Sequence, residues 1–450
     1  MATRTTNQPA PLREVRPLPG AEAFAEELAG EPRDWARLAN EHPPVLRGQE
    51  VEFHPAWDAL LALGRRERLH LPGSHVDRAA KFIALSQVEQ GVGCPLSMTH
   101  AAHAVIDVPD GWLVGMSMTE RQGGSDVRAN ETVARPAGDG TAALHGEKWF
   151  CSAPMSDAFL ILAQAPAGLS CYLVERGDGF VIERLKDKLG NRSNASAEIR
   201  LDGAHGVLVG EEGRGVAAII EMVVHTRLDC VLGSAALQRE AVAQALHWCA
   251  GRVAFGALLS EQPLMQNVLA DLVVEAEAAT ASALRLARAF DDDDPVRRLA
   301  TAVLKYWVCK RTPAVVGEAL ECLGGNGFVE GSSDLPRLYR ESPLNAIWEG
   351  SSNVQCLDVL RALQRDHEPV AAFLDELEPR ERPAVKRALA GADEQGARRL
   401  VETMAVALQA SLLEGETAEL FRAREPYAAF GTLPRSELIG TVLRNALEGS

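Results

Sequence analysis

Four long segments in the second half of the chain repeat apolar residues at helical spacing, and they limit the possible folds more than any other feature. They span residues 216–224, 228–252, 263–290 and 296–323. Apolar side chains recur at positions i, i+3 and i+4, and many are alanines, which let helices pack closely. Because short loops join the segments, we expect antiparallel neighbours in a helical bundle. The acidic run 291–294 lies in one such loop and is interpreted as a solvated turn.

The first half of the chain shows a different pattern. Residues 51–110 have helical periodicity, whereas residues 113–207 hold short strand-like runs, such as 158–163 and 197–201, between Gly and Asp turns. A chain of 450 residues exceeds the usual limit for one core, about 250–300 residues, so several domains are expected. The pattern predicts an α+β protein. The expected parts are an N-terminal helical domain at 1–112, a β-domain at 113–209, a helical bundle at 210–365 and further helices at 366–450.

Composition excludes several classes of protein. No run reaches about 18 uncharged apolar residues, so no membrane span is expected, and residues 1–9 lack the apolar segment of a secretory signal. The eight cysteines form no C-x-x-C pair, which is typical of reduced thiols in a cytoplasmic protein and gives no indication of a metal site. The net charge is −16, and no Lys/Arg cluster of a nucleic-acid binder is present. We therefore expect a cytoplasmic protein that binds no metal.

Residues 347–353 form the most informative motif of the chain. A single carboxylate, Glu349, lies between Trp348 and a Gly-Ser-Ser-Asn turn that precedes an apolar run at helical spacing. Glycine lets a ligand approach the backbone closely, and Ser or Asn at a helix start leaves N–H groups that can face an anion. Alone, the motif has an ordinary alternative, a helix N-terminus with an acidic residue beside it. The upstream segments 118–126 and 321–328, each with paired glycines, favour a ligand site.

These segments resemble the acyl-CoA dehydrogenase flavoprotein family and, within it, the AidB-like branch of alkylation-response flavoproteins. The resemblance covers roughly residues 80–365. One motif alone is weak, but five in the family's order are specific. They are residues 118–126, 148–152, 188–196, 226–230 and 347–351. The resemblance implies the family fold, in which an N-terminal helical domain, a middle β-domain and a C-terminal four-helix bundle follow one another, here with extra C-terminal helices.

The resemblance also implies FAD as the cofactor and an acyl-CoA as the substrate. Removing two hydrogens from Cα and Cβ of a thioester needs a base and a hydride acceptor, and no side chain accepts a hydride. Glu349 matches the family's base, and flavin N5 would take the hydride. Arg227 matches a position near the substrate channel, but at the expected start of a helix it could instead pair with Asp229 or Glu221. No motif identifies the acyl chain or the electron acceptor.

The residues that would hold FAD come in groups along the chain. Thr119 would bond the flavin ring, and Ser125 would reach the pyrophosphate or the pantetheine side of the substrate. Phe150 would cover the flavin face while Ser152 reaches N5. A segment from Arg252 resembles the one that clamps FAD phosphates across a subunit interface, which implies a homotetramer. The full expected set is Met118, Thr119, Gly124, Ser125, Phe150, Cys151, Ser152, Arg252, Phe255, Gln262, Gly324, Gly325, Trp348, Ser351 and Asn353.

Three functions are compatible with this family. Retention of Glu349 favours acyl-CoA dehydrogenation, whereas branch membership favours a DNA-associated protective flavoprotein with vestigial activity. A flavin oxygenase would more readily dispense with the carboxylate. In the branch, DNA binding is associated with the C-terminal helical region, but here residues 366–450 carry 15 acidic and 10 basic side chains, a net charge of −5. The charge therefore argues against DNA binding. No catalytic triad of a hydrolase and no G-x-G-x-x-G segment of a nicotinamide site is found.

Overall fold

The computed structural model describes residues 8–365, 367–425, 433 and 437–448. It divides into two compact units. The β unit comprises Gly30–Ser74 and Val88–Asp229, and the helical unit comprises Met1–Ala29, His75–Gln87 and Cys230–Ser450. Residues 1–7, on which part of the secretory-signal prediction falls, lie outside the described residues. The predicted boundaries at residues 112, 209 and 365 stay a prediction.

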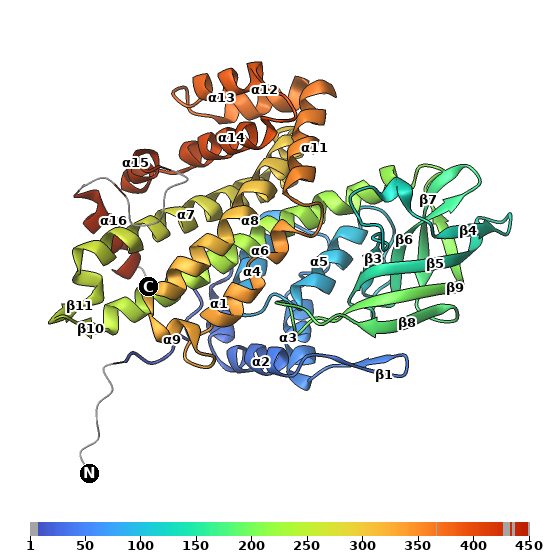
Figure 1. Ribbon diagram of the computed structural model, residues 1–450, viewed down its shortest axis with the longest axis horizontal. Helices are drawn as coiled ribbons and strands as arrows, with labels where there is room; N and C mark the ends of the chain where they lie inside the picture. Colours follow the sequence, from blue (N-terminus) through green and yellow to red (C-terminus); the bar gives the residue numbers. More distant parts are fainter. Residues whose placement is uncertain (1–7, 366, 426–432, 434–436, 449–450) are drawn as a thin grey trace, which may run out of the picture. The chain divides into compact units, whose positions relative to one another are not determined.

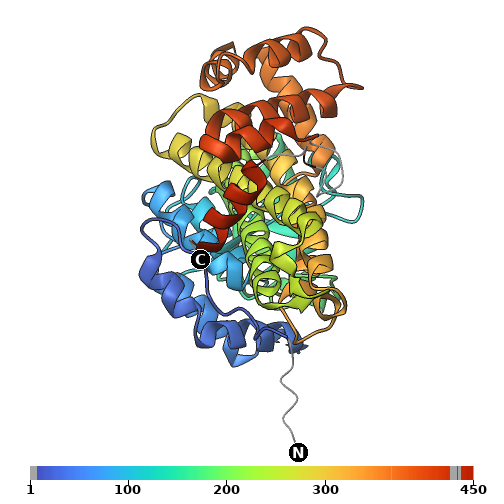
Figure 2. The same cartoon turned by 90° about the vertical axis from the view of Figure 1, so that its left-hand side faces the viewer.

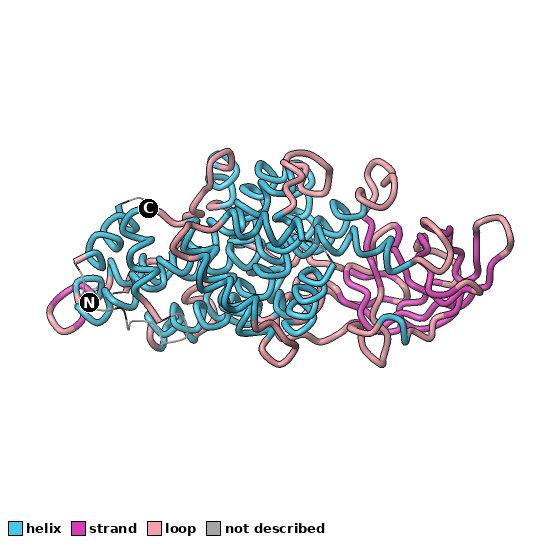
Figure 3. The backbone as a smooth tube through the Cα atoms, turned by 90° about the horizontal axis from the view of Figure 1, so that it is seen from above, coloured by secondary structure: helices cyan, strands magenta, loops and turns pink. Residues whose placement is uncertain are grey.

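A seven-stranded sheet forms the centre of the β unit (Figures 1 and 3), and its strands lie in the segment where the sequence predicts short strands. The strands are β3 (Val114–Ser117), β4 (Val133–Pro136), β5 (Thr141–Ser152), β6 (Ala158–Ala165), β7 (Gly168–Glu175), β8 (Phe180–Leu185) and β9 (Ser196–Val209). Their order is β3-β6-β4-β5-β9-β7, with β8 on β9, and β7 also pairs with β6, so the pairing closes into a barrel. Strand β6 reads as one apolar run because both of its faces are buried.

The β unit also contains short elements outside this barrel. They are η1 (Val127–Ala129), α2 (Glu31–Glu41), α3 (Pro55–Arg66), α5 (Gly93–Ala102) and the hairpin of β1 (Val45–Arg47) with β2 (Glu50–Glu52). The His54 ring accepts a hydrogen bond from the Ala56 N–H (3.1 Å) and so caps α3. The Thr99 hydroxyl of α5 accepts a bond from Val114 N (3.0 Å), which fixes the first residue of β3.

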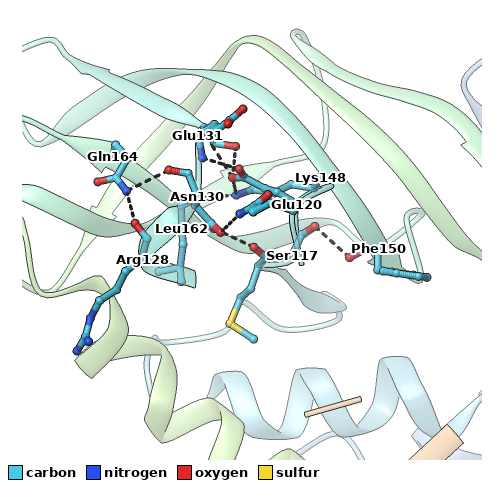
Figure 4. A network of polar contacts seen from close by, with 12 residues as sticks. Ser117, Glu120, Arg128, Asn130, Glu131, Lys148, Phe150, Leu162 and Gln164 are labelled. Carbon is cyan, nitrogen blue, oxygen red and sulfur yellow. Dashed lines mark hydrogen bonds and ion pairs between the residues drawn. The ribbon is translucent and has the colours of Figure 1, made fainter. Parts of the chain in front are cut away.

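Buried Glu120 and Lys148 form the polar centre of the β unit (Figure 4). Lys148 Nζ donates to Glu120 Oε1 (2.6 Å) and to the Leu162 carbonyl (2.7 Å). The Thr132 hydroxyl (2.6 Å) and Glu131 N–H (2.5 Å) also donate to Glu120. Burial alone would raise the pKa of Glu120, but the Lys148 charge and these hydrogen bonds hold that pKa below its ordinary value. The Glu120 carboxylate therefore contributes stability at neutral pH that is lost as pH falls through its folded-state pKa. Burial lowers the pKa of Lys148, so the ammonium itself is disfavoured by folding and depends on Glu120.

The helical unit is built on three long helices. Its elements are α1 (Glu22–Leu28), α4 (His75–Val88, its last residue beyond the unit), α6 (Gly215–Gly251, from Cys230 onward), β10 (Val253–Ala254), β11 (Ala257–Leu258), η2 (Leu259–Glu261), α7 (Pro263–Asp291), α8 (Val296–Cys322), α9 (Gly325–Phe328), α10 (Leu335–Glu341), η3 (Leu344–Ala346) and α11 (Ser352–Arg365). The segments predicted as two helices, 216–224 and 228–252, are one helix, α6. Polar residues interrupt the apolar pattern between them, but neither Gly nor Pro is present to stop a helix.

The C-terminal region adds five helices (Figure 2), of which α14, α15 and α16 contribute residues to the hydrophobic core formed by α6, α7 and α8. They are α12 (His367–Glu376), α13 (Arg382–Ala390), α14 (Ala397–Leu412), α15 (Gly415–Ala423) and α16 (Leu438–Glu448). Arg424 bonds Asp271 (3.3 Å) and Glu275 of α7, and Arg311 of α8 also bonds Glu275 (3.2 Å). Burial would raise the pKa of Glu275, but the two arginine charges hold it below its usual range. This buried ion cluster attaches the C-terminal region to the bundle.

The cysteines and the long helices test two expectations from the composition. All eight cysteines are buried and free of disulfide bonds, as predicted. No helix of the described residues has the length and apolar character needed to cross a membrane.

Replacing Lys148 by Met should destabilise the protein, because Glu120 would lose its buried counter-ion. Removing one partner of a buried ion pair costs about 3–5 kcal/mol. Urea unfolding followed by circular dichroism would measure the change in free energy. The neighbouring Glu147, whose ion pair with Arg121 is exposed, provides the matched control, and Glu147→Gln should change stability by less than about 1 kcal/mol. Equal stability of Lys148→Met and wild type would contradict the importance of the pair.

Candidate functional site

In the β unit, the turn after β3 brings the first predicted group together. Trp149 N–H of β5 donates to the Thr119 carbonyl (2.8 Å), and the Asn130 amide donates to the Met118 carbonyl (2.9 Å). The turn then folds back onto Thr119, since a Cβ on Gly124 would lie 2.3 Å from the Thr119 hydroxyl. Only glycine fits there. Ser125 follows on the exposed outer side of the turn.

The end of β5 brings the second group beside this turn. The pairing of β5 with β9 shifts register between Lys148 and Cys151, and such an irregularity re-aims side chains. Phe150 is 48% exposed, while its carbonyl accepts a bond from the Ser117 hydroxyl (3.3 Å; Figure 4). The Ser152 hydroxyl lies 3.4 Å from that of Ser196. Cys151 is fully buried in the barrel core, so only its backbone could contact a cofactor.

Arg227 does not begin a helix, so that prediction is wrong. It lies well inside α6, which starts at Gly215, and its side chain is buried. The sequence expectation failed because the apolar pattern is interrupted just before Arg227, although the helix continues.

In the helical unit, Glu349 lies in a strained turn before α11. Its φ is +57°, a left-handed conformation that non-glycine residues rarely adopt, and Gly350 follows at +89°. Lys305 Nζ of α8 donates to the Trp348 carbonyl (2.7 Å) and to the Gly350 carbonyl (2.6 Å). The Gln355 amide of α11 donates to the carbonyls of Glu349 (3.1 Å) and Gly350 (2.8 Å). Two helices thus fix the backbone that carries the carboxylate.

The other residues of this motif have separate anchors. Trp348 Nε1 donates to Asn345 Oδ1 (2.8 Å), and the Asn345 amide donates to the Ser234 hydroxyl of α6 (3.1 Å). Asn353 is exposed, and its amide oxygen accepts a bond from Arg398 of α14 (2.8 Å), so the C-terminal region engages it. Ser351, at the start of α11, is half-buried.

The third predicted group lies at another end of the helical unit. Phe255 and Gly256, both with positive φ, form the turn of the β10–β11 hairpin, and Phe255 is 100% exposed. Gln262 donates to the Ala254 carbonyl (3.2 Å), which brings it close to the hairpin and to half-buried Arg252. The Cys249 thiol lies 4.0 Å from the Cys322 carbonyl, and this contact joins the ends of α6 and α8.

Gly324 and Gly325 follow α8 and therefore lie at the same end of the bundle as the β10–β11 hairpin. A Cβ on either glycine would meet nothing within 4 Å. At a rise of 1.5 Å per residue, this end lies about 25 Å along α8 from Lys305 and the Glu349 turn. Within one helical unit, the two groups are too far apart to hold the same end of one ligand.

Sequence reasoning missed Lys305, Gln355 and Asn345, the residues that hold the Glu349 turn. Lys305 is 1% exposed and follows an apolar stretch of α8, residues 299–304. An isolated lysine in an apolar helix is a signal that could have been found, because a buried ammonium requires partners. The two amides carry no comparable signal in the sequence.

Comparison with known proteins gives the family. Residues 20–116 match the "Adaptive response protein AidB N-terminal domain", 115–204 the "Acyl-CoA dehydrogenase, middle domain" and 213–364 the "Acyl-CoA dehydrogenase, C-terminal domain". The chain is 44% identical over 386 residues to the putative acyl-CoA dehydrogenase AidB of Escherichia coli (strain K12), covering 74% of this chain and 71% of that protein. The chain belongs to the acyl-CoA dehydrogenase family, in its AidB-like branch. The predicted family and fold class are therefore confirmed.

Solved structures of the family agree with this assignment. The crystal structure of Caenorhabditis elegans ACDH-11 in complex with C11-CoA has a TM-score of 0.81 at 25% identity, covering 100% of this chain and 93% of that chain. An acyl-CoA dehydrogenase complexed with FAD from Bacillus anthracis shares the fold, with a TM-score of 0.69 at 17% identity, covering 93% of this chain and 86% of that chain.

FAD is the cofactor of this oxidoreductase family, and the residues present fit it. Gly123 of the β3 turn has a φ of +121° and open space beside it, which suits close approach of a ligand to the backbone. The half-exposed Phe150 ring next to this turn offers an apolar face for a flavin. Arg252 supplies a guanidinium suited to phosphate. Our assignment of individual residues to the cofactor stays a prediction.

Proposed function

We propose that the protein dehydrogenates an acyl-CoA thioester between Cα and Cβ, with Glu349 as the base. The observation that carries this proposal is the Glu349 turn, because strained non-glycine conformations persist where surrounding groups over-determine them and cluster at active sites. Four hydrogen bonds from Lys305 and Gln355 hold this turn. When bound, FAD supplies the acceptor for the hydride that leaves Cβ.

Residues of the chain would take the α-proton, bind the cofactor and line the substrate channel. The Glu349 carboxylate would take the α-proton, while Trp348, pinned through its indole to Asn345, would limit how far the turn can move. Thr119 and Ser125 would bind the cofactor from the β3 turn, and Arg227 would line the substrate channel. The complex of the C. elegans relative with C11-CoA supports an acyl-CoA as substrate. Eight buried free thiols support a reducing compartment, the cytoplasm.

Glu349→Gln should slow substrate-driven flavin reduction by about 10²–10⁴-fold, because the amide keeps the shape but cannot accept the proton. Anaerobic stopped-flow with butyryl-, octanoyl- and palmitoyl-CoA, following flavin bleaching, measures the rate. FAD content should stay at the wild-type level. Glu330→Gln changes an exposed glutamate of the same unit and should leave the rate unchanged. Wild-type bleaching by Glu349→Gln would show that another group is the base.

We further propose a homotetramer in which the hairpin end of one subunit completes the FAD site of a neighbour. The separation of this end from the Glu349 turn supports the proposal, as do the exposed side chains of Phe255, Leu264 and Phe328, which a second copy could cover. Arg252 would bind phosphate of the neighbouring subunit's FAD.

Arg252→Ala should therefore release FAD and weaken the assembly together. Analytical ultracentrifugation with absorbance at flavin wavelengths reports both quantities in one experiment. Arg288→Ala, which removes an exposed arginine of α7, should affect neither. A stable tetramer with full FAD occupancy in Arg252→Ala would refute the shared site.

Membership of the AidB-like branch supports a second function, protection of DNA, but charge opposes it. The chain carries a net charge of −16. In the C-terminal region, carboxylates neutralise several arginines: Arg422 pairs with Glu378 and Glu381, and Arg424 pairs with Asp271 and Glu275. Such arginines contribute little net positive potential to a surface.

Duplex DNA should accordingly bind only weakly near physiological salt. A protein that neutralises 6–10 phosphates loses about 10³–10⁵-fold in affinity between 50 and 200 mM salt. Fluorescence anisotropy of a labelled duplex across this range measures the slope, which should be shallow. A tight complex with a steep slope would restore the DNA-protection function.

A further inference from the structure

Helix α8 buries a lysine against the turn that carries Glu349. The Lys305 side chain enters from α8, and the residue is 1% exposed. Its ammonium donates to the carbonyls of Trp348 (2.7 Å) and Gly350 (2.6 Å), the residues on either side of Glu349. One ammonium group therefore bonds the residue before and the residue after the proposed base.

Burying the Lys305 ammonium is unfavourable for folding, so a contribution to stability does not by itself explain why a lysine occupies this position. Burying an ammonium costs free energy unless hydrogen bonds and an opposite charge compensate it. Among the described residues, no carboxylate forms an ion pair with Lys305, and its hydrogen-bond acceptors are the two neutral carbonyls. An apolar side chain of the same length would fill the position without that cost.

What the ammonium holds is a conformation that the chain does not prefer. Glu349 has a φ of +57°, a left-handed backbone conformation that is unfavourable for a non-glycine residue. Buried Gln355 adds hydrogen bonds to the carbonyls of Glu349 (3.1 Å) and Gly350 (2.8 Å) from α11. With donors on α8 and α11, the carbonyls of three consecutive residues have fixed directions.

We propose that Lys305 is a positioning residue that acts through Glu349, an inference that rests on the proposed role of Glu349 as base. By fixing the peptide groups before and after Glu349, it sets the direction in which the carboxylate leaves the backbone. Lys305 touches neither substrate nor cofactor in this role. Gln355, which donates to two carbonyls of the same turn, contributes to this positioning to a smaller extent.

The expected consequence of losing Lys305 is a slower proton transfer with little change in binding. Without the ammonium the turn relaxes towards a preferred backbone conformation and the carboxylate moves. A displacement of about 1 Å can cost on the order of 10²-fold in rate. The affinity for acyl-CoA should change less than about threefold, because the binding surface keeps its shape.

The test compares Lys305→Met and Lys305→Arg in the FAD-loaded protein. Anaerobic stopped-flow with butyryl-, octanoyl- and palmitoyl-CoA gives the rate of flavin bleaching at saturation and the dissociation constant. We expect Lys305→Met to lose about 10²-fold in rate and Lys305→Arg, which keeps charge and donors, to recover at least part of it. Lys310→Met removes an exposed lysine of the same helix and should behave as wild type.

A double variant distinguishes positioning from general damage. If Lys305 acts through Glu349, adding Lys305→Met to Glu349→Gln should slow bleaching little beyond Glu349→Gln alone. Additive losses, or a Lys305→Met protein as fast as wild type, would overturn the inference. If Lys305→Met does not fold, Gln355→Leu takes its place, and the same criteria of a rate-specific, non-additive loss apply. Wild-type bleaching by Glu349→Gln would instead refute the proposed function itself.

Discussion

Side-chain hydrogen bonds from helix α8 fix how several elements of the helical unit are placed around it. Successive residues of this helix reach different elements: Lys305 bonds the Glu349 turn, Tyr306 bonds Glu402 (2.8 Å) and Trp307 bonds Gln409 (2.8 Å) of α14. One turn later Thr312 accepts a bond from Gln238 of α6 (3.0 Å). Because buried polar groups must be satisfied, each bond specifies one rotation and register of α8.

The site and the C-terminal region therefore depend on the same helix. Arg311 of α8 shares Glu275 with Arg424, and Arg298 of α8 pairs with Asp358 of α11 (2.8 Å). A shift of α8 would disturb the turn that carries Glu349 and the attachment of the C-terminal helices together. The Glu275 carboxylate is buried, whereas the Arg298 side chain is 39% exposed, and a buried ion pair is by itself weak evidence for net stability.

Local signals made part of this architecture predictable. The long apolar repeats gave the helices, the short β-prone runs gave the strands at 158–163 and 197–201, and ordered motifs gave the family. The continuous helix α6 was not predictable by these means, because His225 and Arg227 interrupt its apolar pattern without breaking the backbone. Closure of the barrel through β6 and β7 is a non-local pairing that no single segment encodes.

The same distinction applies to the candidate site. Glu349 was found because it lies in a contiguous motif, whereas Lys305 comes from a helix far upstream in the sequence and meets the turn only in the folded chain. Phe150 was placed by resemblance, but the register shift that turns its ring outward depends on pairing with β9. An isolated lysine in an apolar helix signals a buried ammonium, but the sequence does not show which carbonyls it bonds, because every residue supplies a carbonyl.

The eight buried thiols have a consequence for chemical reactivity. Burial raises the pKa of Cys171 to about 12 and, as the main cause, that of Cys356 to about 11, and it also raises the pKa of Cys151. For these three thiols the nucleophilic thiolate is therefore scarce at neutral pH, and their burial keeps electrophiles from the sulfur atoms while the fold is closed. Alkylating reagents would modify these sulfurs only when the protein opens, so the rate of alkylation reports how often the surrounding structure unfolds.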